Sequence, residues 1–162
     1  MSGSLDWQHV RVGDELPALE IDVTATVIVA GAIATRDFMP VHHDRDYANA
    51  QGAPDIFMNI LSSNAYCSRF LTDWAGPEAM IRRLSIRLGV PVFPGSVLTF
   101  TGSVIATSSG PDEGIIEVEL RAANDLGDHL TGTAVLSLPL SVAGAAQLTD
   151  RAVPSVDFGA TG

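Results

Sequence analysis

The sequence predicts a single-domain α+β fold in which a curved antiparallel sheet wraps around one long helix. One stretch, residues 55–76, has helical spacing of its apolar residues, and strand-like alternation occurs before it and in four segments after it. The apolar residues cover most of the helix circumference, which is typical of a buried helix. A strand, a long helix and then a run of strands favour an α+β architecture.

The N-terminal part supplies the first predicted strand. Residues 1–16 read as a polar lead-in, and the domain proper is expected over 17–140. Within 19–34, β-branched and apolar residues alternate with others, so the whole segment is predicted to be a strand. A charged loop follows at 35–46, and the next residues, punctuated by Gly52, form a loop or a short helix.

The central helix is expected to begin at Asp55, a plausible N-cap, and to end at Gly76 and Pro77. Turn-forming residues separate the segments that follow it, and the last three strands are expected to form an antiparallel meander. The four predicted strands are 83–90, 96–108, 115–124 and 129–140. Residues 141–162 are small and polar and are predicted to be a flexible tail. A sheet with open edges favours a side-by-side dimer.

Composition excludes several classes of function. The net charge is −10 and the chain contains no lysine, which argues against nucleic-acid binding and excludes lysine chemistry. The single cysteine, Cys67, excludes an internal disulfide and a cysteine-rich metal site. No apolar run is long enough for a membrane span, and the N-terminus does not resemble a signal peptide. We therefore expect a cytoplasmic protein.

The loop 35–46, TRDFMPVHHDRD, gathers titratable groups that the rest of the chain largely lacks. Asp37 and His42 lie five residues apart just after an apolar segment. Pro40 stiffens the connection, and Val41 gives His42 an apolar neighbour. A carboxylate and an imidazole that converge on one water can activate it. The pair is therefore the candidate catalytic dyad, although spacing alone is weak evidence.

The other histidines and acids have simpler interpretations. Residues 43–46, HDRD, are most easily explained as a solvated, self-paired cluster or a capping sequence. His9 and His129 are expected at the surface. His42 and His43 are sequence neighbours that would point apart on an extended chain, so no metal site is expected.

The start of the long helix could complete the site. If its N–H groups face Asp37 and His42, they could stabilise a developing oxyanion. Asn59 and Asn64 lie on or near the apolar face, and they could line a site or a subunit contact. Arg82, Arg83 and Arg87 are the best local cationic set, although alternation also fits a solvated face. The candidate substrate-binding residues are Asp55, Ile56, Phe57, Asn59 and Arg87.

The stretch DFMPVHHDRDYA resembles the motif of the MaoC-like (R)-specific enoyl-CoA hydratases, D-x-N-P-(aliphatic)-H-x5-A. The matching residues are Asp37, Pro40, Val41, His42 and Ala48. The segment IRLGVPVFPGSVLTFTGSV is similar to strands of the same family, and the resemblance runs from roughly 20 to 140. Stretches such as ATRDFMPVHHDRD, DIFMNIL and NDLGDH resemble the small subunits of heteromeric MaoC-like hydratases of steroid side-chain degradation.

The resemblance implies a hot-dog fold and hydration of an α,β-unsaturated acyl-CoA, with water held between Asp37 and His42. It implies no cofactor beyond the coenzyme A of the substrate. It also implies a larger MaoC-like partner in a heterotetramer with two copies of each subunit, or otherwise a homodimer. Met39 replaces the motif asparagine, Arg36 replaces the usual preceding glycine, and DIFMN lacks the family's glycine at the helix start.

Two alternatives to the hydratase remain open. A hot-dog thioesterase would use a carboxylate on or near the central helix, such as Asp55, to direct water at the thioester carbonyl. A non-catalytic subunit would only complete the pocket of its partner. The motif from 37 to 48 favours hydration.

Overall fold

A computed structural model describes residues 5–140, so the tail expected at 141–162 lies outside the described residues. The strands are β1 (Leu19–Asp22), β2 (Met80–Leu88), β3 (Val97–Ser109), β4 (Glu113–Asn124) and β5 (Gly127–Pro139). The helices are α1 (Ala25–Ala34), α2 (Arg45–Ala50) and α3 (Ile60–Ala75), with 3₁₀ turns η1 (Trp7–His9) and η2 (Pro40–His42). Among the described residues, no helix is both long and apolar enough to span a membrane.

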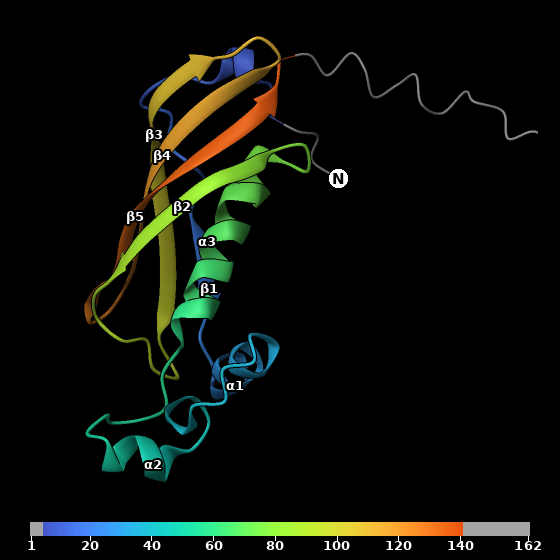
Figure 1. Ribbon diagram of the computed structural model, residues 1–162. Coiled ribbons are helices and arrows are strands. Elements are labelled where there is room, and N and C mark those ends of the chain that lie inside the picture. The colour runs from blue at the N-terminus through green and yellow to red at the C-terminus, as the bar shows by residue number, and fades with distance from the viewer. Residues whose placement is uncertain (1–4, 141–162) are drawn as a thin grey trace, which may run out of the picture.

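The five strands form one antiparallel sheet in the order β1-β3-β4-β5-β2. The predicted meander is confirmed as β3-β4-β5, because each of these strands pairs with the next along the chain. Helix α3 runs alongside this sheet, and its N-terminal end points toward α1 and α2 (Figure 1). This is the predicted hot-dog architecture of a curved sheet around one helix. Strands β1 and β2 form the edges of the sheet within the chain.

The core lies between α3 and the inner face of the sheet. Cys67, Phe70 and Leu71 of α3 are almost completely buried, and the Phe70 ring lies 6.0 Å from the ring of Phe100 on β3. Gly102 permits this approach, since a Cβ there would lie 3.2 Å from the Phe70 ring. Each such buried side chain contributes about 1.5–3 kcal/mol through removal of apolar area from water.

The helix is covered on one face only within this chain. Ile60 and Leu61, in its first turn, are 47% and 46% exposed. The expectation of a helix enclosed on all sides is therefore wrong for the isolated chain. The physical reason is that a single sheet can cover one face of a helix, which leaves the other face for another chain.

The strand predicted over 19–34 is also wrong beyond Asp22. Residues 25–34 form α1, where the Thr24 side chain accepts a hydrogen bond from the Val27 N–H and caps the helix. The alternation that suggested a strand coexists with helical spacing, because the buried residues Ile28 and Ala32 are four apart. An alanine-rich sequence and an N-cap decide the competition in favour of the helix.

The N-cap of the long helix lies four residues later than predicted. Asn59, rather than Asp55, is the N-cap, and its side chain accepts a hydrogen bond from the Ser62 N–H at 3.0 Å. The Asp55 carboxylate is instead engaged by Arg45 at 2.8 Å. The predicted end is confirmed, since Gly76 is the C-cap.

The lead-in lies against the sheet. Its residue Leu16 is buried and donates its N–H to the Gly102 carbonyl, and Glu15 forms a bridge with Ser103. The Trp7 ring lies over Gly114, where a Cβ would clash with it at 2.2 Å. Leu16 and Trp7 therefore attach this segment to β3 and β4, two inner strands of the sheet.

His129, expected at the surface, is only 2% exposed. Its Nδ1 lies 2.7 Å from the Val90 carbonyl, which can only accept, so Nδ1 carries the proton. Its Nε2 then accepts from the Ser63 hydroxyl at 2.8 Å. The imidazole therefore links the start of β5 to the first turn of α3 as a buried, neutral group. His9 is largely exposed, as expected.

The buried His129 should make the protein sensitive to acid. Burial lowers the pKa of His129 below its ordinary value of 6.5, and the hydrogen bond to Val90 only opposes this. The unfolded chain therefore binds the proton more readily, so the free energy of unfolding is highest above pH 6.5 and falls as the pH drops below it. The loss from this group is at most about 1.4 kcal/mol per pH unit.

Urea unfolding between pH 8 and pH 5 tests this expectation. The variant His129→Gln should be less stable at pH 8 but should lose less stability on acidification than the wild type. His9→Gln, at an exposed position, is the matched control and should follow the wild-type pH dependence. Parallel pH curves for His129→Gln and wild type would contradict the assignment.

Candidate active site

Asp37 is placed by the C-terminal end of α1. The helix ends in a Schellman motif, in which the Asp37 N–H donates to the Ala32 carbonyl at 2.9 Å and the Arg36 N–H donates to the Ile33 carbonyl at 3.0 Å. The carboxylate oxygen Oδ1 accepts from the Met39 N–H at 3.3 Å. The position of Asp37 is therefore fixed to α1 by its own backbone.

Arg36 adopts a left-handed backbone conformation to allow this turn. Its φ is +58°, and among residues 5–140 it is the one non-glycine residue with a positive φ. Side chains at such a position clash with the backbone, at a cost of about 1–2 kcal/mol. This cost explains why glycine usually precedes the aspartate in the motif that residues 37–48 resemble.

Replacing Arg36 with glycine is expected to raise the free energy of unfolding by about 0.5–1 kcal/mol, the relief of strain minus the entropy cost of glycine. Chemical denaturation measures this change. Arg36→Ala removes the same guanidinium but keeps the Cβ, so it should give no comparable gain. Equal stability of the two variants would contradict the strain argument.

His42 lies on η2 and is 7% exposed. Its Nδ1 is 2.7 Å from the Phe57 carbonyl, which can only accept, so Nδ1 carries a proton and Nε2 is the nitrogen left to face the site. The Phe57 ring packs edge-on against the imidazole, with ring centres 5.1 Å apart. The carbonyl and the ring of Phe57 thus hold both the tautomer and the orientation of His42.

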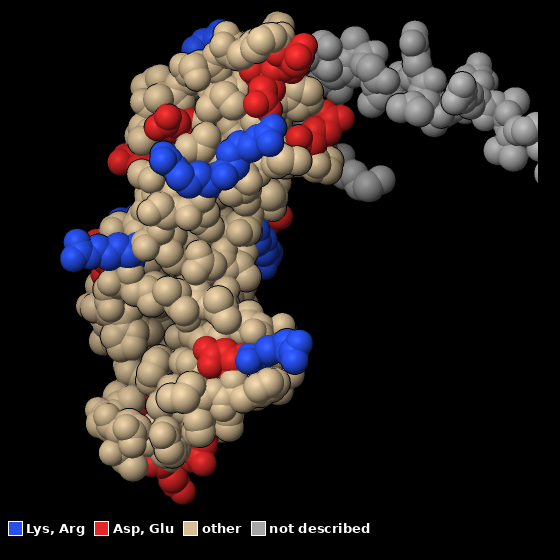
Figure 2. Space-filling view, in the orientation of Figure 1, with Lys and Arg blue, Asp and Glu red and all other residues tan. Residues whose placement is uncertain are grey.

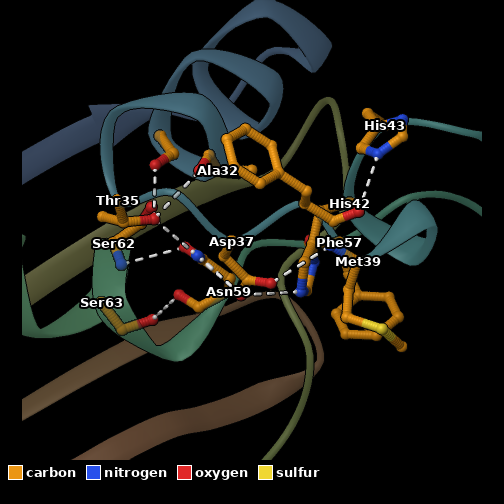
Figure 3. A network of polar contacts seen from close by, with 12 residues as sticks. Ala32, Thr35, Asp37, Met39, His42, His43, Phe57, Asn59, Ser62 and Ser63 are labelled. Atoms are coloured by element: carbon orange, nitrogen blue, oxygen red, sulfur yellow. Dashed lines mark hydrogen bonds and ion pairs between the residues drawn. The ribbon is translucent and has the colours of Figure 1, made fainter.

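The His42 Nε2 faces the Asp37 carboxylate. The distance from Nε2 to Asp37 Oδ2 is 3.4 Å, and the two side chains are 9% and 23% exposed. Figure 3 shows the Asp37 carboxylate between His42 and Asn59. A hydrogen bond from the Asn59 amide is the main cause that lowers the pKa of Asp37, whereas burial acts in the opposite direction. Asp37 is thus held as a carboxylate beside the imidazole, and the predicted pair does come together.

Asn59 connects this pair to the long helix. Its Nδ2 donates to Asp37 Oδ2 at 3.0 Å and to the Thr35 hydroxyl at 2.9 Å. An amide donor to Asp37 is therefore supplied from α3, whereas the side chain of Met39 has no donor to offer. In this structure all hydrogen-bonding groups of the Asn59 side chain are engaged by the protein, so direct contact with a substrate stays a prediction.

The first turn of α3 provides free backbone donors. The N–H of Ser62 bonds Asn59 Oδ1 and that of Ser63 bonds the Asn59 carbonyl. Within residues 5–140, the N–H groups of Ile60 and Leu61 have no acceptor, as expected for the first residues of a helix. The Met58 N–H is engaged by the Val92 carbonyl. The candidate oxyanion donors are therefore at Ile60 and Leu61.

The structure does not bring the other predicted residues to the dyad. Asp55 is bound to Arg45, which is the main cause that lowers the pKa of Asp55. Ile56 is 6% exposed and belongs to the core. Arg87 is exposed on β2 and pairs in register with Thr131, which in turn pairs with Arg121. Their role in substrate binding stays a prediction.

The capping interpretation of 43–46 is confirmed, but the expected self-pairing is wrong, because Arg45 pairs with Asp55 outside the cluster. Asp44 caps α2 by accepting from the Tyr47 N–H at 3.0 Å, and His43 is exposed and bonds the Phe38 carbonyl through Nε2. His42 and His43 therefore point to different partners. Thr35 was not predicted from the sequence. Its hydroxyl accepts a hydrogen bond from the Asn59 amide and donates to the carbonyls of Gly31 and Ala32. No local signal marks it, because its partner lies 24 residues away.

A broad depression lies elsewhere on the surface. It is lined by residues 15–18 and by outer-face residues such as Thr101, Arg121 and Thr131, and it includes neither Asp37 nor His42. Figure 2 shows acidic side chains interspersed with the arginines, and a hollow beside α3 just above α1. The hollow, rather than the depression, lies near the N-terminal end of α3.

No family model matches the chain. A curated relative, the 3-oxo-4,17-pregnadiene-20-carboxyl-CoA hydratase beta subunit of Mycobacterium tuberculosis, is 48% identical over 127 residues, which are 78% of this chain and 95% of that protein. The chain belongs to the MaoC-like hydratase family. This membership agrees with the Asp37–His42 pair and with the fold.

Solved structures place the chain in the same family. A chain of the ChsH1-ChsH2 complex from Mycobacterium tuberculosis is 48% identical and superposes with a TM-score of 0.75, covering 79% of this chain and 98% of that one. The (R)-hydratase of A. caviae involved in PHA biosynthesis is 25% identical with a TM-score of 0.74, covering 82% and 99% of the two chains.

Proposed function

We propose that this chain is the catalytic subunit of a heteromeric hydratase that adds water to an α,β-unsaturated acyl-CoA. The observation that carries the proposal is that His42 Nε2 faces Asp37 Oδ2 at 3.4 Å while Nδ1 is held by the Phe57 carbonyl. One water can lie against both atoms and donate to each of them when Nε2 is unprotonated. A largely buried carboxylate beside an imidazole fits water activation better than a structural ion pair.

The proposed reaction begins with water held by Asp37 and His42. His42 Nε2 takes a proton as the water oxygen adds to the β-carbon of the enoyl thioester. The electron pair of the double bond moves toward the thioester oxygen, where N–H groups at the start of α3 stabilise the charge. The imidazolium then returns the proton to the α-carbon, so one molecule of water is added in total. Asp37 stabilises the imidazolium through its negative charge.

The proposed substrate is a steroid carboxyl-CoA, by likeness to the relative named for 3-oxo-4,17-pregnadiene-20-carboxyl-CoA. The site is incomplete for such a ligand in this chain alone. Phe38 and Met39 beside Asp37, and Ile60 and Leu61 beside Asn59, are 46–65% exposed. A partner hot-dog subunit that covers them would enclose an apolar acyl pocket. The likeness to a subunit of a two-protein complex supports this arrangement.

A shortage of cations supports a role for the partner in coenzyme A binding as well. The net charge is −10, and several of the nine basic residues are already paired with acids, among them Arg45, Arg69, Arg82 and Arg121. The phosphates of coenzyme A therefore need donors beyond those near the dyad. The proposed chemistry needs no cofactor other than the coenzyme A of the substrate. The cytoplasmic location expected from the sequence stays a prediction.

The thioesterase alternative is less well supported. It would use Asp55 as the carboxylate that directs water, but Arg45 and the Ile56 N–H both bind the same oxygen of that carboxylate. The third alternative, a subunit without chemistry of its own, does not explain why the tautomer of His42 and both oxygens of Asp37 are held by specific donors and acceptors.

Product analysis on the co-expressed complex tests the proposal. The chain and a larger MaoC-like partner would be purified together and supplied with a steroid enoyl-CoA and a short enoyl-CoA. A product heavier by one water with its thioester intact supports the hydratase. Release of free coenzyme A would establish the thioesterase instead. If both substrates kept their carbon–carbon double bond and their thioester bond, both assignments would fail.

A further inference from the structure

Asn59 is buried to 97% and has an unusual position between two elements of the site. As N-cap, it fixes the first turn of α3 by accepting the Ser62 N–H at 3.0 Å. With its amide nitrogen it reaches Asp37, 22 residues earlier in the chain, at 3.0 Å. One side chain therefore ties the proposed catalytic carboxylate to the helix that offers the oxyanion donors.

The orientation of the Asn59 amide is determined by its partners. Its oxygen must face the Ser62 N–H, which can only donate, and its nitrogen must face the Asp37 carboxylate, which can only accept. The Thr35 hydroxyl donates to the Gly31 and Ala32 carbonyls at 2.8 and 3.2 Å, so it accepts the second amide proton. No flipped orientation satisfies all of these contacts.

The amide binds the carboxylate oxygen that matters for the chemistry. Oδ2 of Asp37 receives the Asn59 proton and faces His42 Nε2, whereas Oδ1 receives the Met39 N–H. Both oxygens are therefore constrained, and the carboxylate plane is set relative to the imidazole. This contact is also the main cause that lowers the pKa of Asp37.

Few charged groups compete with this contact. Within residues 5–140, His42 is the only ionisable side chain that comes within ion-pair distance of Asp37. On the neighbouring elements, Arg45 is bound to Asp55, and His43 bonds the Phe38 carbonyl. The Asn59 amide therefore lowers the pKa of Asp37 most, the Met39 N–H and the His42 imidazole lower it further, and burial opposes them.

We infer that Asn59 is a positioning residue of the hydratase site, which aligns the Asp37 carboxylate with His42 and couples it to the N-terminus of α3. The inference deepens the proposed function and rests on it for the kinetic result. It also makes a prediction about the ionisation of Asp37 that does not depend on any activity.

Two variants separate this role from that of a helix cap. Asn59→Ser keeps a good N-cap but removes the donor to Asp37, and Asn59→Asp keeps the cap and the shape but places a second carboxylate against the first. Asn64→Ser is the matched control, because the same change on the same helix removes only a bond to the Ile60 carbonyl. All three variants should fold, and urea unfolding checks this.

In the complex with its partner, Asn59→Ser is expected to lower kcat by about 10–100-fold with little change in KM, as expected for a misaligned catalytic group. Asn59→Asp should lower kcat further and shift the acid limb of the kcat/KM profile upward by about one pH unit or more, because two adjacent carboxylates cannot both ionise easily. Asn64→Ser should match the wild type. Wild-type kcat and pH profile in both Asn59 variants would overturn the inference.

An NMR titration of His42 gives the second readout and is independent of hydratase activity. Its imidazole signals should respond to the ionisation of Asp37, and the acid inflection should move to higher pH in Asn59→Ser and further in Asn59→Asp. If the inflection moves but the wild-type complex adds no water, the positioning contact stands and the proposed function fails. An inflection at the same pH in all proteins would overturn the positioning role itself.

Discussion

Replacing Asp37 with asparagine is expected to lower the kcat for hydration by about 10²–10⁴-fold, the range that acid–base groups contribute. Asparagine has the same shape, but it cannot stabilise an imidazolium as a carboxylate does. In addition, its amide would present either a donor or a neutral acceptor to the Asn59 amide at 3.0 Å. Steady-state hydration by the complex at saturating enoyl-CoA measures the change.

Asp44→Asn is the matched control for this substitution. Asp44 belongs to the same loop, is exposed and caps α2 through the Tyr47 N–H, a role that asparagine fulfils equally well. Its kcat should therefore remain close to wild type. Equal rates for Asp37→Asn and the wild type would remove Asp37 from the chemistry.

Replacing Gly31 with leucine is expected to cost at least about 10²-fold in kcat, although Gly31 does not contact the dyad. A Cβ at this position in α1 would lie 2.3 Å from Ser62 Oγ and 3.3 Å from Ser62 Cβ in α3. The two helices must then separate. Asp37 moves with α1, to which its N–H is bonded, while Asn59 moves with α3. A displacement of about 1 Å in a catalytic group can cost 10²-fold.

The stability of the Gly31→Leu variant should fall by about 1–3 kcal/mol, as for other overpacked contacts. Ala30→Leu adds the same side chain at an exposed position of the same helix and should retain both stability and kcat. The decisive comparison is kcat of folded protein at a temperature well below both unfolding transitions. Full activity of Gly31→Leu there would show that the spacing of α1 and α3 does not set the geometry of the dyad.

Features that depend on local pattern could be predicted from the sequence. The strands β2 to β5 follow from alternation, because one face of each is packed against the core and the other carries polar residues. Asp37 and His42 could be proposed together because the short loop between them, stiffened by Pro40, limits how far apart they can be. The resemblance to a known motif added what spacing alone could not.

The errors arose where two local patterns compete. Residues 25–34 satisfy both a period of two and a period of four, and the Thr24 cap decides for the helix. Asp55 and Asn59 are both good caps before an apolar stretch, but Arg45 binds the Asp55 carboxylate and leaves the cap to Asn59. That choice depends on a contact across ten residues, which no helical signal encodes.

The role of Asn59 could not be predicted for a similar reason. Its bonds to Thr35 and Asp37 exist only because α1 and α3 cross closely at Gly31 and Ser62. Met39 shows in the sequence that one donor is missing from the motif, but the sequence does not show where its replacement lies. The burial of His129 likewise follows from its contacts with Val90 and Ser63 and not from its place near a turn.

The most direct test of the proposed mechanism is the hydration rate of the complex in which only this subunit carries His42→Ala, with a wild-type partner. We expect a loss of about 10²–10⁴-fold in kcat, because the proposed mechanism uses Nε2 of His42 as the base for the water. His43→Ala, one residue away and exposed, should keep the wild-type rate. A His42→Ala complex as active as wild type would place the chemistry on the partner and reduce the loop 35–46 to a charged turn.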